Sequence, residues 1–245
     1  MVRAFAKSEL LVTRICRGQY GPLLTALLVL CVAAPVLTGS VFKGALLDAA
    51  MSCIVLTGLY AADPRRRSLV IGFALACITL ATHRLIQFVH YEPLHMVHYA
   101  LIFSVLAYTA RTILWAVVRD SRVTLETIKG AVCVYLLIGL TWVYLFVMID
   151  MATPGSFRIA PSAAAAAEGH LLIRQELHRL LYLSFCTLTT LGYGDIVPLR
   201  GVAQTACYLE AVVGQIFLTV LVARLVGMHI SRPPAVPLPE EPGRI

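Results

Sequence analysis

Long apolar runs, separated by short polar breaks, dominate the chain and predict an all-α membrane protein. An α-helix needs about 20 mostly apolar residues to cross a hydrocarbon core that is roughly 30 Å thick. Prolines and charged residues stand in several of the breaks between the runs. We therefore expect six transmembrane helices, over residues 21–41, 45–62, 68–89, 95–118, 129–151 and 202–228.

A further apolar stretch, residues 176–189, is too short to span a membrane. Short segments at membrane depth are tolerated where protein buries them or where they line a water-filled cavity. The pattern therefore predicts a re-entrant helix between the fifth and sixth crossings, followed by a polar loop.

Composition agrees with a membrane location, and the distribution of charge sets the expected orientation. Of the 245 residues, 59% are hydrophobic and 13% are charged, whereas soluble proteins average roughly 25% charged residues. The formal net charge is +7, and most Lys and Arg residues fall on one side of the predicted helices, as in cytoplasmic segments. We expect a multi-pass protein of the cell membrane, with both termini cytoplasmic, that contacts lipid and not nucleic acid.

The polar loop after the short helix carries the chemistry. It reads Thr-Leu-Gly-Tyr-Gly-Asp over residues 190–195. To pass K⁺ quickly, a protein must replace the water shell of the ion with oxygen ligands, which stacked rings of backbone carbonyls provide. Glycine reaches backbone conformations closed to other residues, so Gly192 and Gly194 allow successive carbonyls to turn towards one axis. The segment resembles the selectivity filter of the potassium channel superfamily.

This resemblance implies an ion site and an assembly. K⁺ would bind to the main-chain oxygens of Thr190, Leu191, Gly192 and Tyr193, with the Thr190 hydroxyl at the inner mouth. One chain supplies one strand of such a filter, so the partners of each subunit would be three identical subunits in a homotetramer. The short helix would point its partly negative C-terminal end at the ion. No cofactor is implied beyond the permeant K⁺.

The resemblance also assigns residues that support the filter. In the family, an aromatic residue on the short helix holds the aspartate after the filter, and Tyr182 stands in that position to hold Asp195. Thr189 leads into the filter, and Cys186 stands where some relatives carry glutamate. Leu183 replaces a tryptophan of many relatives, so a hydrogen bond that braces the filter tyrosine would be missing.

The last apolar run resembles the pore-lining helix of the family. Gly214 would be either a hinge or a site of close packing behind the filter, since glycine inside a helix costs about 1 kcal/mol relative to alanine. Leu218, Val222 and Val226 recur every four residues, which fits either a hydrophobic gate or ordinary helix packing. Glu210 would lie behind the filter, bonded to the short helix, or would contact the ion directly.

The expected organisation has five parts. An N-terminal cytoplasmic segment is followed by a four-helix region, an amphipathic linker, the pore domain and a short proline-rich tail, over residues 1–20, 21–118, 119–128, 129–230 and 231–245. The layout of six crossings resembles voltage-gated potassium channels, but the fourth crossing offers only Arg111 in its interior. A steep sensor needs three or four gating charges per subunit. We therefore expect weak or no voltage dependence, and the pore half resembles channels of the bacterial inner membrane.

Histidines gather around the break before the fourth crossing. His83, His90, His95 and His98 fall close together there, near Glu92. They could sense protons or bind a metal, because histidine titrates near neutral pH. The alternative is that they are histidines at the membrane interface without such a role.

Two other functions compete with a potassium channel. Leu183 makes a poorly selective monovalent cation channel conceivable. A secondary transporter usually shows internal repeats and broken helices near the midplane, and neither is evident in the sequence. No recognisable nucleophile, metal or phosphate constellation predicts an enzyme.

Overall fold

A computed structural model describes residues 18–36, 92–120, 124–159 and 173–230, with short stretches between residues 70 and 86. The expected crossings at 45–62 and 68–89 lie wholly or largely outside the described residues, as do the N-terminal segment up to residue 17 and the tail from 231. The elements are α2 (Gly21–Val36), α5 (Glu92–Arg119), α6 (Leu125–Ala152), β1 (Phe157–Ile159), α7 (Ile173–Leu188), β2 (Ile196–Pro198) and α8 (Gly201–Ile230).

Three helices in the described part of the chain are long and apolar enough to cross a membrane. They lie within α5, α6 and α8, over Pro93–Arg119, Leu125–Ala152 and Gly201–Arg224. These helices correspond to the expected fourth, fifth and sixth crossings. A shorter apolar helix, Gly21–Val32, falls within α2 at the position of the expected first crossing.

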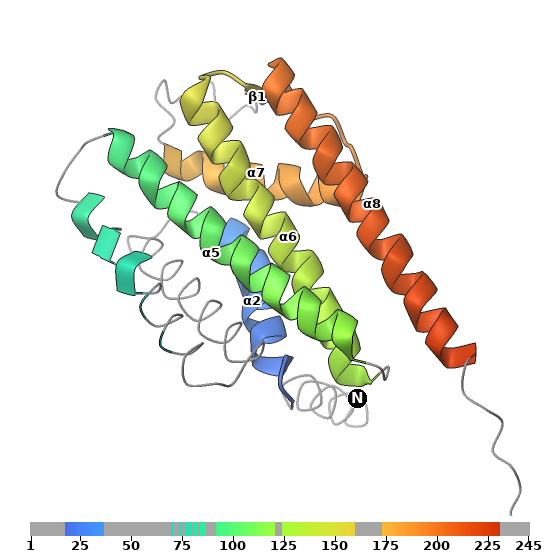
Figure 1. Ribbon diagram of the computed structural model, residues 1–245. Coiled ribbons are helices and arrows are strands. Elements are labelled where there is room, and N and C mark those ends of the chain that lie inside the picture. Colours follow the sequence, from blue (N-terminus) through green and yellow to red (C-terminus); the bar gives the residue numbers. More distant parts are fainter. Residues whose placement is uncertain are drawn as a thin grey trace, which may run out of the picture.

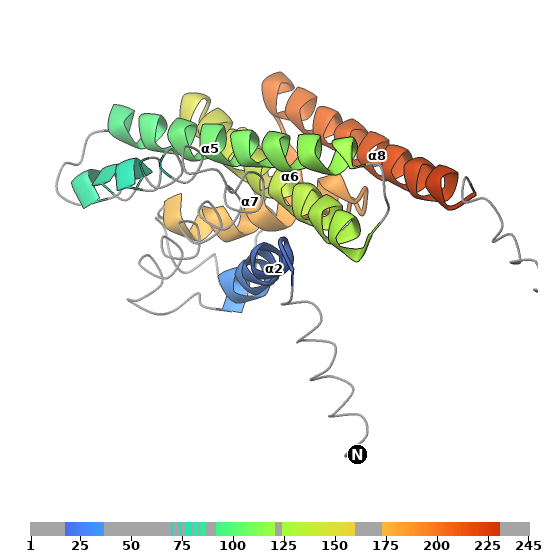
Figure 2. The same ribbon diagram turned by 60° about the horizontal axis from the view of Figure 1, so that its bottom comes forward.

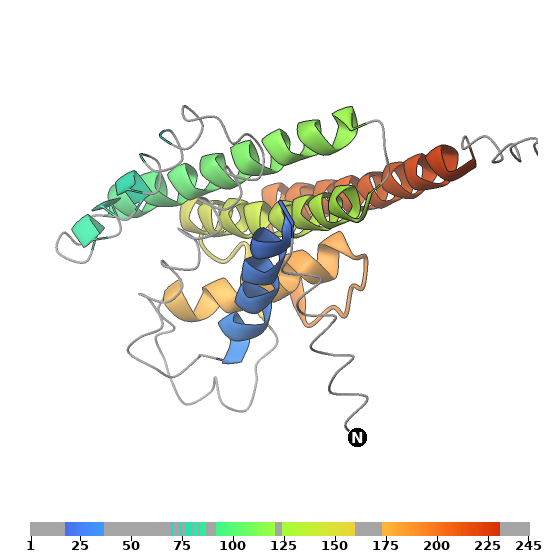
Figure 3. The same ribbon diagram turned by 90° about the horizontal axis from the view of Figure 1, so that it is seen from below.

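The helices form two layers, and α6 packs against helices of both. Helices α5, α6 and α8 lie side by side, with α6 in the middle, and α2 and α7 lie against one face of this layer (Figures 1 and 2). Figure 3 shows the same arrangement from below, with α2 crossing the long helices. Because α6 contacts α5, α7, α2 and α8, it is the helix on which the others pack.

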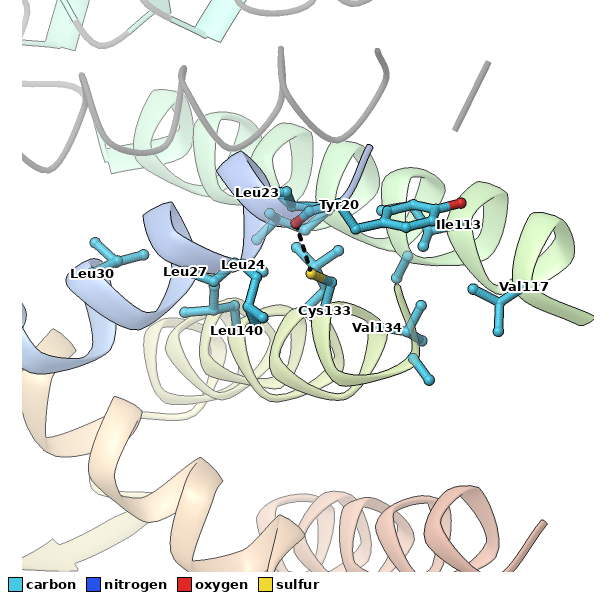
Figure 4. Close-up of a cluster of buried hydrophobic side chains, with 14 of the residues drawn as sticks. Tyr20, Leu23, Leu24, Leu27, Leu30, Ile113, Val117, Cys133, Val134 and Leu140 are labelled. Carbon is cyan, nitrogen blue, oxygen red and sulfur yellow. Dashed lines mark hydrogen bonds between the residues drawn. The ribbon is translucent and has the colours of Figure 1, made fainter. Parts of the chain in front are cut away.

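The packing of α2 depends on leucines that α5 and α6 cover. Leu23 and Leu27 are fully buried, and they meet the cluster that holds Ile113 of α5 and Leu140 of α6 (Figure 4). In the same place the Cys133 thiol donates a weak hydrogen bond to the main-chain oxygen of Tyr20, at 3.9 Å. Between apolar helices in lipid, close van der Waals packing of this kind is a main source of stability.

Helix α6 begins before the expected start at residue 129. Thr124 caps it, because its hydroxyl accepts a hydrogen bond from the Thr127 amide at 3.2 Å. Thr127 in turn donates to the Asp120 carboxylate at 2.9 Å, which closes the turn after α5. Arg119 is still part of α5 and residues 125–128 are already part of α6, so half of the expected linker at 119–128 is helix, and residues 121–123 lie outside the described part of the chain.

Helix α5 also begins before its expected start at residue 95. It starts at Glu92 with Pro93 in its first turn, where the missing proline N–H leaves no hydrogen bond unmade. His95 and His98, which fall within the expected fourth crossing, lie on this helix, whereas His83 and His90 lie outside the described residues. His98 is buried, with Nδ1 2.9 Å from the Thr82 hydroxyl. Within the described residues no group of three potential metal ligands occurs.

Two short strands were not predicted from the sequence. β1 and β2 pair antiparallel, with Phe157 opposite Pro198 and Ile159 opposite Ile196. The Leu199 amide continues the pairing by donating to the Ser156 carbonyl at 2.7 Å. This ribbon joins the end of α6 to the segment before α8, so it fixes the chain on the far side of residues 190–195.

Arg224 ties α8 to the end of α5. Its guanidinium donates to the main-chain oxygens of Val117 at 2.6 Å, of Val118 at 3.1 Å and of Asp120 at 2.5 Å. The Val117 and Val118 carbonyls belong to the last turn of α5 and the Asp120 carbonyl directly follows it, so all three lack helical partners. A cation there also meets the partly negative end of the helix.

We predict that Arg224→Gln lowers the melting temperature of the detergent-solubilised protein. Hydrogen bonds to charged groups contribute about 1.5–3 kcal/mol each, and Arg224→Lys should recover only part of the loss, because an ammonium lacks the planar fork. Arg200→Gln is the matched control, because Arg200 is exposed and precedes α8. Equal melting temperatures for Arg224→Gln and the control would contradict this role.

Candidate ion-conduction site

Helix α7 ends halfway along the long helices. Its 16 residues extend about 24 Å, which is less than the hydrocarbon thickness. Its last residue, Leu188, meets Gly139 near the middle of α6 and Gly214 near the middle of α8. The Tyr135 hydroxyl donates to the Leu188 carbonyl at 3.2 Å. The partly negative end of α7 therefore lies at mid-depth in the helical layer.

The chain after α7 turns back so that its amides bond to the helix it has just left. The Thr190 amide donates to the Thr187 carbonyl at 2.9 Å. The Leu191 and Gly192 amides both donate to the Cys186 carbonyl, at 2.8 and 3.4 Å. Carbonyls in the last turn of a helix lack helical partners, and these bonds supply them.

The backbone of the same segment alternates in sign. Thr190, Gly192 and Gly194 have φ values of +58°, +59° and +79°, whereas Leu191 and Tyr193 do not have positive φ. Alternation between left- and right-handed conformations lets successive carbonyls point to one side of the chain. Thr190 is the sole non-glycine residue with positive φ among the described residues, and a β-branched residue rarely adopts this conformation.

The face opposite the amide bonds is open within the subunit. In the described part of the chain, no hydrogen bond ends on the main-chain oxygens of Thr190, Leu191, Gly192 or Tyr193. The Leu191 and Tyr193 side chains are 55% and 69% exposed. In the described part of the chain these four main-chain oxygens are therefore unengaged, and the Leu191 and Tyr193 side chains beside them are largely uncovered by the subunit.

Tyr182 gathers the expected supporting residues at one end of the segment. Its ring stacks on Tyr193, with centroids 6.4 Å apart and planes 4° from parallel. The Asp195 carboxylate and the Cys186 thiol lie close enough to its hydroxyl to interact with it electrostatically. The Asp195 carboxylate also accepts from the Ile196 amide at 3.1 Å. The chain thus brings together four of the residues that the sequence had singled out.

The remaining supporting position, Thr189, caps the last turn of α7. Its amide and hydroxyl both donate to the Phe185 carbonyl, at 3.0 and 2.6 Å. Leu183 is buried on the same helix, and its side chain has no polar atom with which to bond residues 190–195. Tyr193 consequently receives its ring contact from Tyr182 and not from position 183.

Glu210 connects three helices behind the segment. It is completely buried, and the Ser184 hydroxyl of α7 lies 2.5 Å from its Oε1 and 2.8 Å from the Gly139 carbonyl of α6. The second carboxyl oxygen, Oε2, has no hydrogen-bond partner in the described part of the chain. A carboxyl group in this position links α8 to the short helix.

Gly214 is a site of close packing. A Cβ atom added there would lie 2.3 Å from the Leu188 carbonyl oxygen, and α8 continues through this position as one helix. Of the two roles expected for Gly214, a hinge or a site of close packing, this geometry favours close packing. Below it, Leu218, Val222 and Val226 are all exposed in the subunit, so α8 carries apolar side chains that the described residues leave uncovered.

Sequence reasoning missed several residues that hold the site together. They are Tyr135, Gly139, Ser184 and Gln215. Each acts through a contact between segments far apart in the sequence. A glycine inside an apolar helix was the one available signal, at Gly139, where an added Cβ would lie 2.9 Å from the Phe185 ring.

Comparisons with known proteins agree with this geometry. Residues 169–230, which include α7, residues 190–195 and α8, match the family described as ion channel. The chain is 33% identical to Protein LctB of Bacillus caldotenax over 119 residues, which is 47% of this chain and 83% of that protein. Protein LctB of Geobacillus stearothermophilus is 31% identical over the same shares. No solved structure matches the chain.

We predict that Gly214→Ala separates α8 from α7 and lowers the thermal stability of the assembled protein. The added methyl group has no room against the Leu188 backbone, which cannot move like a side chain tip. Gly227→Ala on the same helix is the matched control, because an added Cβ there meets nothing within 4 Å. That change should be neutral or should stabilise by about 1 kcal/mol.

Thermal unfolding and size-exclusion chromatography check this prediction. Equal stability of the two alanine variants would contradict close packing at Gly214. It would favour the hinge instead, because a hinge glycine tolerates alanine in the folded state and changes opening.

Proposed function

The chain belongs to the ion channel family, and we propose that it is one subunit of a homotetrameric, potassium-selective channel. The filter is Thr190 to Gly194, and the ligands of dehydrated K⁺ are the main-chain oxygens of Thr190, Leu191, Gly192 and Tyr193 with the Thr190 hydroxyl. The subunit lies in the cell membrane with both termini in the cytoplasm. The channel is passive and needs no cofactor.

One observation carries the proposal: the amides of the filter segment turn into α7 while its carbonyls remain unengaged. The Thr190, Leu191 and Gly192 amides bond to α7 carbonyls, which fixes the direction of the opposite face. The alternating φ signs of residues 190–194 favour carbonyls on one side. A strand of this kind offers a cation a column of oxygen atoms without side chains in the way.

Uncovered apolar surface supports a fourfold assembly. One strand surrounds an ion only when identical strands complete the ring, and a closed ring of identical subunits is cyclic. The exposed Leu191 and Tyr193 side chains need a neighbouring subunit to cover them. Helix α8 also exposes large apolar side chains along its length, which neighbours, the pore or lipid would meet, namely Val202, Leu209, Val213, Ile216, Val220 and Val222.

The position of α7 supports selectivity for cations. Its C-terminal end lies at mid-depth, where the cost of bringing a charge into the membrane is greatest. A helix end is equivalent to roughly half a negative charge, and four such ends would face one ion. The filter then replaces the hydration of the cation, and the spacing and field of its carbonyls favour K⁺ over Na⁺.

Voltage dependence is weak or absent in this proposal. Helix α5 carries only Arg111 between its ends, and the Arg119 guanidinium at its end lies over the Trp115 ring, 5.1 Å from the centroid. One charge moving through 100 mV supplies about 2.3 kcal/mol, which is too little for steep opening.

A poorly selective monovalent cation channel is the second candidate, and the surroundings of Leu183 favour it. Leu183 is buried and has no donor for the Tyr193 hydroxyl, so the filter depends on the stacking of Tyr182. A filter with fewer braces holds its carbonyls less rigidly. Reversal potentials in mixed K⁺ and Na⁺ distinguish the two candidates.

We predict that Gly192→Ala abolishes K⁺-selective flux into liposomes while the tetramer still assembles. Space is open at this position, so the effect comes from the backbone, where a left-handed non-glycine residue costs about 1–2 kcal/mol. Tyr193→Ala should also abolish selectivity, because it removes the ring that stacks on Tyr182.

Gly155→Ala is the matched control for backbone strain. Gly155 has a φ of +75° and open space, but it lies in the turn between α6 and β1. This variant should keep K⁺ over Na⁺ selectivity despite a comparable loss of stability. Retained selectivity in Gly192→Ala or Tyr193→Ala would contradict the assignment of the filter.

A further inference from the structure

Gln215 is a polar side chain on α8 that the proposed function does not use. It follows Gly214 directly and is exposed within the subunit. Its Nε2 lies 3.3 Å from the Thr190 hydroxyl oxygen at the first position of the filter segment. The close contact of Gly214 with the Leu188 carbonyl fixes the height of α8 against α7, so Gln215 is held level with Thr190.

The single proton of the Thr190 hydroxyl fixes which group donates in the hydrogen bond between Thr190 and Gln215. A hydroxyl group has one proton to donate and two lone pairs to accept with. The Thr190 hydroxyl donates its proton to the Thr189 carbonyl, at 2.7 Å. Its oxygen can therefore only accept from Gln215, which requires the amide nitrogen and not the amide oxygen to face it. One lone pair then remains for a cation.

Thr190 also needs support of this kind. It is β-branched and has a φ of +58°, and residues held in such rare conformations cost about 1–3 kcal/mol and persist where their surroundings hold them. Its amide donates to the Thr187 carbonyl and its hydroxyl donates to the Thr189 carbonyl. The same hydroxyl oxygen accepts from the Gln215 side-chain amide. Gln215 is the one member of this set that comes from α8.

We propose that Gln215 tunes the innermost cation site of the filter by donating a hydrogen bond to the Thr190 hydroxyl oxygen. This inference rests on the proposed function, since it concerns the ion that the filter binds. A donor on a ligand oxygen draws electron density from it and uses one of its lone pairs. The innermost ring consequently binds a cation less tightly, which lets the ion leave. Gln215 is a positioning residue that acts through Thr190 and sets how tightly this site binds a cation.

The affinity of block by Ba²⁺, applied from the cytoplasmic side, measures how tightly the innermost site binds a cation. Ba²⁺ resembles K⁺ in size but carries twice the charge, so its affinity depends more steeply on the field of the ligands. Gln215→Leu keeps a side chain of similar size and removes the donor. One hydrogen bond is worth about 0.5–1.5 kcal/mol, so Ba²⁺ should block this variant about 2- to 12-fold more tightly than the wild type.

A double-mutant cycle with Thr190→Val separates tuning from a general structural effect. Valine removes the hydroxyl through which Gln215 acts, so Gln215→Leu should not change Ba²⁺ block in that background. Gln204→Leu is the matched control, because Gln204 lies in the first turn of α8 and faces the Pro198 and Leu199 carbonyls at 3.4 Å. It should leave the block unchanged. Size-exclusion chromatography establishes that each variant assembles.

The outcomes distinguish this inference from the proposed function. If the wild type conducts K⁺ and Na⁺ equally, the proposed function fails and the inference fails with it. If the wild type is K⁺-selective and Gln215→Leu leaves Ba²⁺ block unchanged, the inference alone is overturned. A shift of the same size in the Thr190→Val background would also overturn it, whereas a shift that vanishes there supports it.

Discussion

The packing of α7 against α8 at Gly214 is the contact on which the rest of the site depends. Helix α8 passes so close to the Leu188 carbonyl that a side chain at position 214 has no room. This approach sets the depth at which α7 ends and the point at which the chain turns. The hydrogen bond between Ser184 and Glu210, four residues earlier on α8, holds the same two helices together. These contacts between helices set where residues 190–195 begin, and the Tyr193 ring and the Thr190 hydroxyl add contacts of their own.

Given that placement, the geometry of the filter segment follows from the needs of the backbone. Carbonyls in the last turn of α7 lack helical partners, and the next amides of the chain supply them. The Thr190, Leu191 and Gly192 amides turn towards α7, and the main-chain oxygens of residues 190–193 accept no hydrogen bond in the described part of the chain. Positive φ at Gly192 and Gly194 allows this alternation without strain, and Thr190 adopts it with help from its neighbours. The same turn of the chain thus supplies hydrogen-bond donors to the last turn of α7 and leaves the main-chain oxygens of residues 190–193 without hydrogen-bond donors in the described part of the chain.

Much of this arrangement could be predicted from the sequence, because it depends on local patterns. The length of the apolar runs indicated the long helices and the short one, and the spacing of Gly192 and Gly194 indicated where the backbone needs positive φ. The contacts of Gly139, Ser184 and Tyr135 could not be predicted, since they join helices far apart in the chain. Thr190 was expected to bind an ion, but propensity argues against a left-handed threonine. The helix start at Leu125 is set by the Thr124 cap, which hydropathy does not detect.

A structure of the assembled protein in K⁺, compared with one in the heavier ion Rb⁺, tests the central claim most directly. The account predicts four subunits around one axis, with ion density on that axis between rings formed by the main-chain oxygens of Thr190 to Tyr193. An assembly without fourfold symmetry would contradict it, as would ions bound elsewhere or oxygens of these residues that face away from the axis.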